Sequence, residues 1–423
     1  MRLLELGYEL PKNWREATIS DVTSKVGSGA TPRGGSSVYT NNGIPLVRSQ
    51  NVLDNSFSNA GLAFLSDQSA SSLKNVELRA NDVLLNITGD SILRCCLLPD
   101  VMIGGRVNQH VAIIRASDAV IPLYLQKWLV QDWFKDFMLS HSAGATRKAI
   151  TKGQILSFPI ALPPLPEQRR IAEVLGALDD KIKSNRQVCS LIDLLATELF
   201  CDRFTVHTRG GTSDLMTIGD IGEIVGGGTP SKKVEEYYAD SGIAWLTPRD
   251  LSKDRSIFRQ HGEFDISELG LRKSSARLLP RGTVLFTSRA PIGYIAIASG
   301  ETSTNQGFKS IVPHSNFGTP FTFYLLKQLT PEIVTSANGS TFKEISKSGL
   351  AKVSFKSPST EAVQAFNATV QPLLNLQEVK EIENCQLSQL RDTLLPELMS
   401  GRMRVDKAGC LVSEALDEEV ADV

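Results

Sequence analysis

The sequence predicts an α/β protein of the α+β type. Two homologous globular domains are joined by two long helices that form an antiparallel coiled coil, which gives one chain approximate two-fold symmetry. Three observations predict this fold: the first half of the chain is echoed by the second, each copy ends in a helical segment, and both segments carry heptad patterns. The expected parts are a domain at 1–160, a spacer helix at 161–204, a domain at 205–358, a spacer helix at 359–405 and a flexible acidic tail at 406–423.

The internal repeat is a series of short matches that keep the same order and a nearly constant offset. A period this long indicates a duplicated domain, because solenoid repeats are much shorter. Each match alone is weak, but chance does not readily produce their common order. The matching segments include Ile19-Ser20-Asp21-Val22 with Ile218-Gly219-Asp220-Ile221, Gly29-Ala30-Thr31-Pro32 with Gly228-Thr229-Pro230, Asn108-Gln109 with Asn305-Gln306, and Tyr124-Leu125-Gln126-Lys127 with Tyr324-Leu325-Leu326-Lys327.

Each copy begins with short runs of β-forming residues separated by Gly, Asn and Ser clusters. Asp82 to Leu85 and Thr283 to Phe286 are two such runs. The intervening clusters are typical of turns and loops, and the repeated Gly-Thr-Pro segments are expected to be turns. The matching pairs Asn108-Gln109 and Asn305-Gln306 are also candidate contact residues on these loops, although we expect Asn108 and Asn305 to hold turns.

The first long helix is predicted to open at Pro163-Pro164-Leu165-Pro166-Glu167-Gln168. Proline is tolerated in the first turn of a helix, and an acidic residue suits its positive end. A polyproline ligand is the alternative, disfavoured because the prolines run straight into a helix. A plain amphipathic surface helix is also open, but four heptads favour a helix partner, with Asn185 fixing the register. The predicted contact stripe is Ile171, Leu175, Leu178, Ile182, Asn185, Cys189, Ile192, Ala196 and Leu199.

The second long helix supplies the expected partner. Its residues also alternate at spacings of four and three, with a polar middle. We expect Pro372 to kink or restart this helix. An antiparallel pair would place the two domains at opposite ends of a rod. The predicted stripe is Leu373, Leu376, Lys380, Glu383, Leu387, Leu390 and Leu394.

Composition indicates a soluble cytoplasmic protein. Hydrophobic residues make up 41% and charged residues 22% of the chain. No apolar run reaches the ~18 residues that a membrane helix needs, and the start has no secretory pattern. The six cysteines contain no CxxC motif and are expected to be reduced thiols. The net charge is −1, yet residues 1–160 carry +3 and residues 205–358 carry +4, so charge leaves nucleic-acid binding open.

Signatures of catalysis are missing from the sequence. The stretch from Gly226 to Lys232 lacks the second glycine of a phosphate-binding loop, and no dinucleotide or HExxH motif occurs. The five histidines do not cluster at metal-ligand spacing. Asp179-Asp180-Lys181 and Glu378-Val379-Lys380 resemble nuclease motifs, but both fall in predicted helices and are expected to be surface charge. We therefore predict no catalytic residue and no metal or other cofactor in this chain.

Polar side chains on corresponding loops are the candidate contacts to DNA. Arginine, lysine, asparagine and glutamine read base edges and phosphates, although the same residues are also common on solvated loops. The predicted contacts are Arg48, Gln50, Asn51, Thr88, Arg94, Arg106, Arg147 and Lys148 in the first copy, and Arg249, Ser288, Arg289 and Lys343 in the second.

The layout resembles the specificity subunit of type I restriction–modification systems. The segment from Leu162 to Ile171, which leads from prolines into the first helix, carries the resemblance together with the opening Leu10-Pro11-Lys12-Asn13-Trp14. The resemblance covers the chain up to about Arg404. The second copy departs from it at Pro358-Ser359-Thr360-Glu361, which lacks the double proline and the Glu-Gln pair.

The resemblance implies a non-catalytic subunit that recognises DNA. Each domain would read one half of a split, asymmetric site in double-stranded DNA. The helices would act as a spacer and would dock two methylase subunits, which ATP-using restriction subunits would join. S-adenosylmethionine, ATP and magnesium would belong to those partners, with no cofactor in this chain.

Two other classes of function stay open on the residues alone. An adaptor that presents two protein-binding modules on a coiled coil, without DNA, fits the near-zero net charge. An enzyme with a dispersed site ranks below it.

Overall fold

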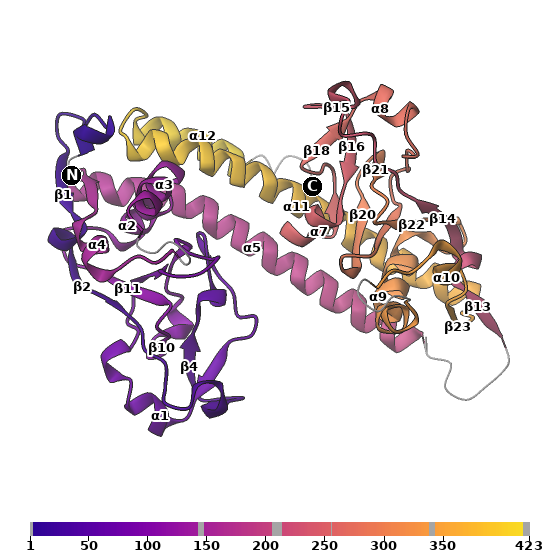
Figure 1. Ribbon diagram of the computed structural model, residues 1–423, viewed down its shortest axis with the longest axis horizontal. Coiled ribbons are helices and arrows are strands. Elements are labelled where there is room, and N and C mark those ends of the chain that lie inside the picture. Colours follow the sequence, from indigo (N-terminus) through magenta and orange to yellow (C-terminus); the bar gives the residue numbers. More distant parts are fainter. Residues whose placement is uncertain (1–2, 143–147, 205–213, 255, 338–342, 418–423) are drawn as a thin grey trace. The chain divides into compact units, whose positions relative to one another are not determined.

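The computed structural model describes residues 3–142, 148–204, 214–254, 256–337 and 343–417. Its contacts divide the chain into two units, Met1–Ser184 with Asn384–Val423, and Asn185–Glu383. The boundary falls inside both long helices, α5 (Leu165–Arg203) and α11 (Thr360–Met399), which are labelled in Figure 1. Each unit therefore contains one globular domain and a segment of each long helix.

The domain of unit 1 is built from two four-stranded sheets. One has the order β2-β11-β8-β9 and the other β10-β4-β7-β3. The five residues of β8 are all buried, with Val83 and Leu85 in one core and Leu84 in another, so this strand is apolar on both faces. The strands are β2 (Thr23–Ser28), β11 (Val111–Ala116), β8 (Asp82–Asn86), β9 (Cys95–Leu97), β10 (Arg106–Val107), β4 (Ile44–Val47), β7 (Ala63–Leu65) and β3 (Tyr39–Thr40).

Two strand pairs and four short helices complete this domain. β1 (Arg15–Thr18) pairs antiparallel with β12 (Pro159–Leu162), and β5 (Val52–Leu53) pairs with β6 (Ser56–Phe57). The strand pair β1–β12 joins the beginning of the domain to its end, next to the start of α5. The helices are α1 (Asp67–Ser71), α2 (Pro122–Leu129), α3 (Asp132–Ser140) and α4 (Lys152–Ser157).

The domain of unit 2 repeats this topology. Its sheets have the orders β14-β22-β19-β20-β17 and β15-β18-β16-β21, so each strand except β17 has a counterpart in unit 1. The strands are β14 (Gly222–Gly226), β22 (Lys309–Pro313), β19 (Val284–Ser288), β20 (Ile292–Ala298), β17 (Phe258–Arg259), β15 (Tyr238–Ala239), β18 (Phe264–Ile266), β16 (Ile243–Leu246) and β21 (Thr302–Thr304), with β13 (Leu215–Thr217) paired to β23 (Ser354–Lys356). The helices are α6 (Ile218–Ile221), α7 (Pro248–Lys253), α8 (Glu268–Arg272), α9 (Gly318–Ser336) and α10 (Lys347–Ala351). The predicted duplication is confirmed.

The repeated Ile-x-Asp segment has a local structural cause. The Asp21 carboxylate accepts the backbone N–H of Thr18 at 2.8 Å, and Asp220 accepts that of Thr217 at 2.7 Å. Each pair caps the short helix that follows the first strand of its domain. Hydrogen bonds of this kind favour the charged carboxylate, so the Thr18 bonds lower the pKa of Asp21.

The two long helices contact each other, as predicted. In unit 2, Cys189 lies against the carbonyl of Gln377, and Phe200 packs edge-on against Phe366 at 5.4 Å between ring centroids. The number falls along α11 as it rises along α5, so the two segments of unit 2 run antiparallel. In unit 1, Arg391 of α11 bonds Asp179 of α5 at 3.1 Å.

The predicted stripe on α5 is mostly buried. Ile171, Leu175, Leu178 and Ile182 are buried in unit 1, Asn185 and Ile192 are buried in unit 2, and Leu199 is half-buried. On α11, Leu387 and Leu394 are buried and Leu390 is half-buried against the same core.

The prediction for the first part of α11 was wrong. Leu376 is 43% exposed and Leu373 is only half-buried. Phe366 anchors the buried stripe through its packing on Phe200 and Tyr324, which turns the two leucines to another side of the helix. The helix does not restart at Pro372, because α11 is continuous through this exposed residue. The residues buried there are Val363, Phe366, Val370, Leu374 and Gln377.

The expectation of a flexible tail was also wrong for most of its length. Residues Val405–Asp417 form helix α12 in unit 1. Val405, Ala408 and Val412 are buried, and their spacing of three and four places them on one helical face. The acidic residues of α12 alternate in sequence with these apolar ones and are exposed. Composition alone therefore indicated a solvated segment.

Candidate nucleic-acid interface

The two domains present the same turn, at Asn108–Val111 and Asn305–Phe308. In the first, the N–H of Asn108 donates to Val47 O at 3.0 Å, and Val111 N–H donates back to Asn108 O at 3.1 Å. In the second, Asn305 donates to Leu246 O at 2.9 Å and Phe308 donates to Asn305 O at 3.2 Å. The same backbone bonds therefore form in both copies.

Each asparagine also closes the turn with its side chain. The Asn108 Oδ1 atom accepts the N–H of His110 at 3.2 Å, and Asn305 Oδ1 accepts that of Gly307 at 2.8 Å. Side-chain bonds of this type fix tight turns. The residue between, Gln109 or Gln306, is exposed to solvent.

A glycine at the start of the repeated Gly-Thr-Pro region, Gly29 in the first copy and Gly227 in the second, packs against each turn. A Cβ atom on Gly29 would lie 2.1 Å from Val107 O, and one on Gly227 would lie 2.0 Å from Asn305 O. These contacts leave no room for a side chain, which explains the glycine at both positions. The same packing places Thr229 beside the second turn, where its hydroxyl donates to the Gln306 carboxamide.

Several predicted contacts lie close to the turn of unit 1. Thr88 lies two residues after the end of β8, and its hydroxyl is hydrogen-bonded to the His110 ring at 2.7 Å between Oγ1 and Nδ1. Thr88 also pairs with Ala149, the residue that follows the exposed Lys148. Arg94 is exposed on the hairpin that joins β8 to β9. Arg147 lies outside the described residues.

Arg48 and Gln50 follow β4, the strand whose last carbonyl, Val47 O, accepts the N–H of Asn108. The Arg48 guanidinium lies over the Tyr39 ring at 5.6 Å and donates to Gly61 O. Gln50 is exposed and its amide donates to the same carbonyl at 3.1 Å. Both side chains therefore border the 60–61 loop.

In unit 2, the loop after β19 meets the segment around Lys343, as the Thr88 loop meets the segment around Lys148 in unit 1. The half-buried Arg289 lies 3.6 Å from Glu344, and Lys309 lies 3.7 Å from the same carboxylate. Burial lowers the pKa of Lys309, and Glu344 opposes that shift. Lys343, next to Glu344, is exposed. Arg249 lies at the start of α7, is 71% exposed, and has its guanidinium 3.8 Å from the Glu263 carboxylate.

Three predicted contacts are wrong, because their side chains are used inside the domains. Asn51 is fully buried and its amide donates to Ser58 O at 2.9 Å. Arg106 is 6% exposed and donates through Nε to Ala70 O at 3.0 Å. Ser288 is fully buried and its hydroxyl donates to Gly307 O at 3.0 Å. These residues position the loops and do not reach a ligand outside the domain.

The sequence repeat had already indicated Gln109 and Gln306 as candidate polar contacts, because Asn108-Gln109 and Asn305-Gln306 match in sequence. Thr229 was not among the predicted contacts. Thr229 bonds a residue 77 positions away, a contact that no local pattern predicts.

A comparison with protein families decides what these domains are. The family model described as type I restriction modification DNA specificity domain matches residues 11–192 and again 211–387. The chain belongs to this family. It is the DNA specificity subunit of a type I restriction–modification system, and the family is non-catalytic.

Curated relatives agree with this assignment. The type I restriction enzyme HindI specificity subunit of Haemophilus influenzae is 21% identical, over 92% of this chain and 100% of the relative. The putative type I restriction enzyme MjaX specificity subunit of Methanocaldococcus jannaschii is 22% identical over 95% and 96%. The MjaIX specificity subunit of the same organism is 40% identical over 173 residues, which are 40% of each chain.

A solved structure shares the fold of this specificity subunit. The S subunit of a type I restriction–modification system from M. genitalium aligns with 92% of this chain and 97% of its own, with 16% identity and a TM-score of 0.58. The two-domain fold with long helices is therefore found in an experimental structure of the family.

The long helices of the specificity subunit hold each domain through an equivalent lysine. Lys127 of α2 bonds Asp179 of α5, and Lys327 of α9 bonds Asp193 of α5 at 2.6 Å. The first lysine side chain is 0% exposed and the second is 35% exposed. Burial lowers the pKa of Lys127, and the Asp179 carboxylate opposes that shift.

One side of the helix pair in unit 2 is apolar and exposed. We call the residues on it the leucine face, and they are 43–64% exposed: Leu191, Leu194, Leu195, Leu376 and Val379. Asp193 and Glu378 bind Lys327 and Arg281 of the domain. Leu191, Leu195 and Leu376 lie two positions from these acids, about 200° around the helix, and so point away from the domain.

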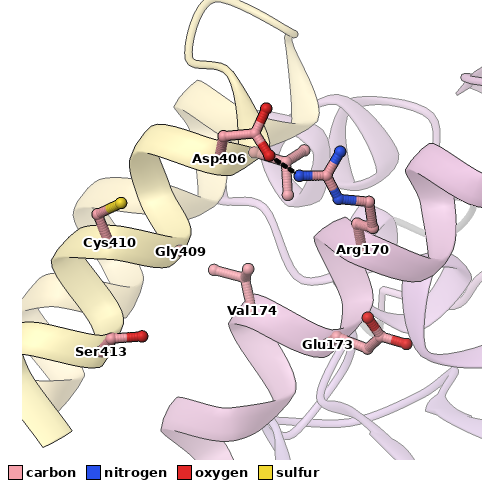
Figure 2. A pocket seen from close by; sticks show the side chains of 8 residues that line it. Arg170, Glu173, Val174, Asp406, Gly409, Cys410 and Ser413 are labelled. Atoms are coloured by element: carbon pink, nitrogen blue, oxygen red, sulfur yellow. Dashed lines mark hydrogen bonds and ion pairs between the residues drawn. The ribbon is translucent and has the colours of Figure 1, made fainter.

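In unit 1, helix α12 packs on the first part of α5. Arg170 pairs with Asp406, and Val174 lies against Gly409, whose Cβ would be 4.0 Å from a Val174 methyl. Figure 2 shows the shallow groove between the two helices, with Cys410 and Ser413 on α12 and Glu173 on α5.

Two further findings concern cofactors and membranes. Among the described residues, no group of three or more His, Cys, Asp or Glu is arranged to hold a metal ion. None of the helices in the described part of the chain is both long and apolar enough to cross a membrane.

Proposed function

We propose that each domain of this specificity subunit binds one half of a bipartite, asymmetric site in double-stranded DNA. The observation that carries the proposal is the equivalent turn in the two domains, with polar loops gathered around each one. The turns share an equivalent exposed lysine, Lys148 or Lys343, but other side chains near them differ, since His110 of the first turn is replaced by Gly307 in the second and Lys309 follows only the second turn. Two domains with one frame and different side chains suit two different half-sites.

The exposed side chains divide by chemistry into two roles. Exposed lysines and arginines such as Lys148 and Arg249 suit phosphate oxygens, which position a protein on DNA without reading its sequence. Arg94 and Gln50, also exposed, can donate to base edges in the major groove. The remaining predicted contacts, Arg48, Thr88, Arg289 and Lys343, border the same loops.

The helices fix the gap between half-sites and dock two methylase subunits in this proposal. The leucine face is the docking surface on unit 2, since several large apolar side chains on one side of a helix pair mark an interaction site. ATP-dependent restriction subunits join the assembled complex, which acts in the cytoplasm.

The chemistry of modification and cleavage then belongs to the partners. S-adenosylmethionine is bound by the methylase subunits, and ATP and magnesium serve the methylase and restriction assembly. The specificity subunit contributes its DNA-reading loops and its helices.

Domain exchange tests the half-site assignment. Residues 15–155 are replaced by the equivalent domain of a relative, and the chimera is combined with purified methylase subunits. The methylated sites are then read from a random DNA library. One half of the recognised site should change and the other half should stay. A simultaneous change in both halves would contradict independent reading.

A second experiment separates DNA recognition from the adaptor alternative. Affinity for DNA is measured at increasing salt in the presence of methylase subunits. Phosphate contacts release counterions, so log Kd should depend steeply on log salt concentration. A flat dependence would contradict direct contact with the DNA backbone.

Leu376→Asp tests the docking surface, because it should weaken methylase binding and leave the thermal unfolding of the chain unchanged.

A further inference from the structure

We infer that Gln109 and Gln306 are equivalent base-reading side chains, and that each reads the adenine of an A·T pair through the major groove. The inference rests on the proposed function, since it assigns a base contact within each half-site. Both residues have a backbone held by the hydrogen bonds of the turn and a side chain that is exposed to solvent.

The backbone presents both glutamines in the same way. Each is the second residue of a turn whose first residue, Asn108 or Asn305, is bonded to a neighbouring strand, to the fourth residue and to the third. The glycine contact behind each turn blocks movement away from solvent. The glutamine Cα is therefore held in place while its side chain is exposed. A rigid backbone carrying a solvent-exposed polar side chain is what a specific contact requires, because little conformational freedom is then lost on binding.

The other residues of the turns do not serve this purpose. Both asparagine side chains are bonded within the turn. The residue after the glutamine is histidine in one copy and glycine in the other, and the fourth is valine or phenylalanine. Only the asparagine and the glutamine are the same in both turns. The asparagine is explained by the turn geometry, whereas nothing in the turn geometry requires the glutamine.

A neighbouring polar group orients each carboxamide. The Thr229 hydroxyl donates to the carbonyl oxygen of Gln306. The Gln109 amide lies 3.4 Å from Nε2 of His110, whose other ring nitrogen bonds Thr88 at 2.7 Å. These partners touch the carboxamide at one atom, which leaves other donor and acceptor positions for a ligand.

The chemistry of the carboxamide selects the base. It places one donor and one acceptor side by side, which matches N7 and the N6 amino group of adenine. Guanine offers two acceptors at the same edge, so one of the two hydrogen bonds would be lost. A bidentate contact of this kind discriminates against the wrong base by about 10- to 100-fold.

The test replaces each glutamine separately in the full chain. Gln109→Ala and Gln306→Ala are compared with Gln68→Ala and Gln260→Ala, which remove exposed glutamines of the same two domains away from the turns. Each variant is combined with purified methylase subunits and presented with a library in which every position of both half-sites is randomised. Methylated sequences are counted, and thermal unfolding is measured to verify the fold.

Gln306→Ala should lose the preference for A·T at one position of one half-site by about 10- to 100-fold, and Gln109→Ala should do so in the other half-site. The two control variants should keep the full recognised sequence. An unchanged sequence preference in both turn variants would overturn the inference. So would equal weakening on every sequence, which marks a backbone contact, or a lost preference at a G·C pair. A wild-type chain without separate half-sites would overturn the proposed function and the glutamine assignment together, whereas separate half-sites that both turn variants retain would overturn the glutamine assignment alone.

Discussion

The ion pairs Lys127–Asp179 and Lys327–Asp193 allow the effect of burial on an ion pair to be compared within one chain. Each joins a helix of the domain to α5, and the lysines stand at equivalent positions of the repeat. The first lysine side chain is 0% exposed, whereas Lys327 and Asp193 are 35% and 36% exposed. Asp179→Ala and Asp193→Ala therefore remove the carboxylate partner of a lysine in two different environments, and Asp179→Ala also removes the pair of Asp179 with Arg391 at 3.1 Å.

The expected costs differ because a buried charge without a partner is far more expensive than an exposed one. Asp179→Ala leaves the Lys127 ammonium in the core with Asn55 as its remaining hydrogen-bond partner at 2.7 Å. Breaking a buried pair in this way costs about 3–5 kcal/mol. Asp193→Ala removes a half-exposed pair, for which about 0–1 kcal/mol is expected.

Native-state hydrogen exchange measures both units in one sample. A loss of about 3–5 kcal/mol reduces protection by two to three orders of magnitude, since about 1.4 kcal/mol is a factor of ten. Asp179→Ala should show this loss in α2 and leave α9 unchanged. Asp193→Ala should reduce protection of α9 less than about tenfold. Similar losses in the two variants would refute the argument from burial.

The dependence on pH provides an independent check. Burial lowers the pKa of Lys127, and removal of the Asp179 carboxylate removes the group that raises it. The unfolded chain then binds a proton that the folded chain does not, so the stability of Asp179→Ala rises with pH until the unfolded lysine titrates near ~10.4. The difference in stability between Asp179→Ala and wild type should narrow as the pH rises toward ~10.4. A constant difference would show that the lysine charge is not the cause.

Three further changes give distinct readouts. Phe200→Ala removes a fully buried ring that packs on Phe366 and Tyr324, and should cost unit 2 about 3–5 kcal/mol, measured as lost exchange protection in α9. Gly227→Ala places a Cβ about 2.0 Å from Asn305 O and should disturb sequence preference in one half-site only, measured by methylation of a random library. One heptad inserted after Ser184 and another after Glu383 should lengthen each helix by ~10.5 Å and shift the preferred gap by ~3 base pairs. An unchanged gap in a functional variant would show that the helices do not set the spacing.

The parts of the fold that sequence predicted are those that repeat or that follow helical periodicity. The two domains share strand order because the segments around Asp21 and Asp220, and the two Asn-Gln turns, are local structures that their own residues close. The stripe of α5 was predicted because its apolar residues point to one side over four heptads. Local rules were sufficient in these places.

The errors arose where a contact distant in sequence decides the outcome. The leucines at 373 and 376 fit a heptad as well as Val370 and Leu374 do, and the choice depends on Phe200, more than 160 positions away. Arg106 was expected to be exposed, but three carbonyl groups accept its guanidinium within the domain, at Ala70, Gly104 and Gly105. Composition of the C-terminal segment concealed the apolar stripe of α12 in the same way.

The same limit separates the position of a recognition loop from the identity of the residues that read DNA. A turn and its glycine can be located from sequence, because backbone geometry restricts which residues fit. A side chain becomes available to a ligand only if nothing inside the domain uses it, and that depends on tertiary contacts. Asn51 and Gln50 are neighbours in one loop, yet the Asn51 side chain is buried and donates to backbone carbonyls while the Gln50 side chain is exposed. Duplication adds information here, because a polar residue that recurs in both copies without a structural role needs an explanation outside the fold. Gln109 and Gln306 meet that criterion, whereas Asn108 and Asn305 do not.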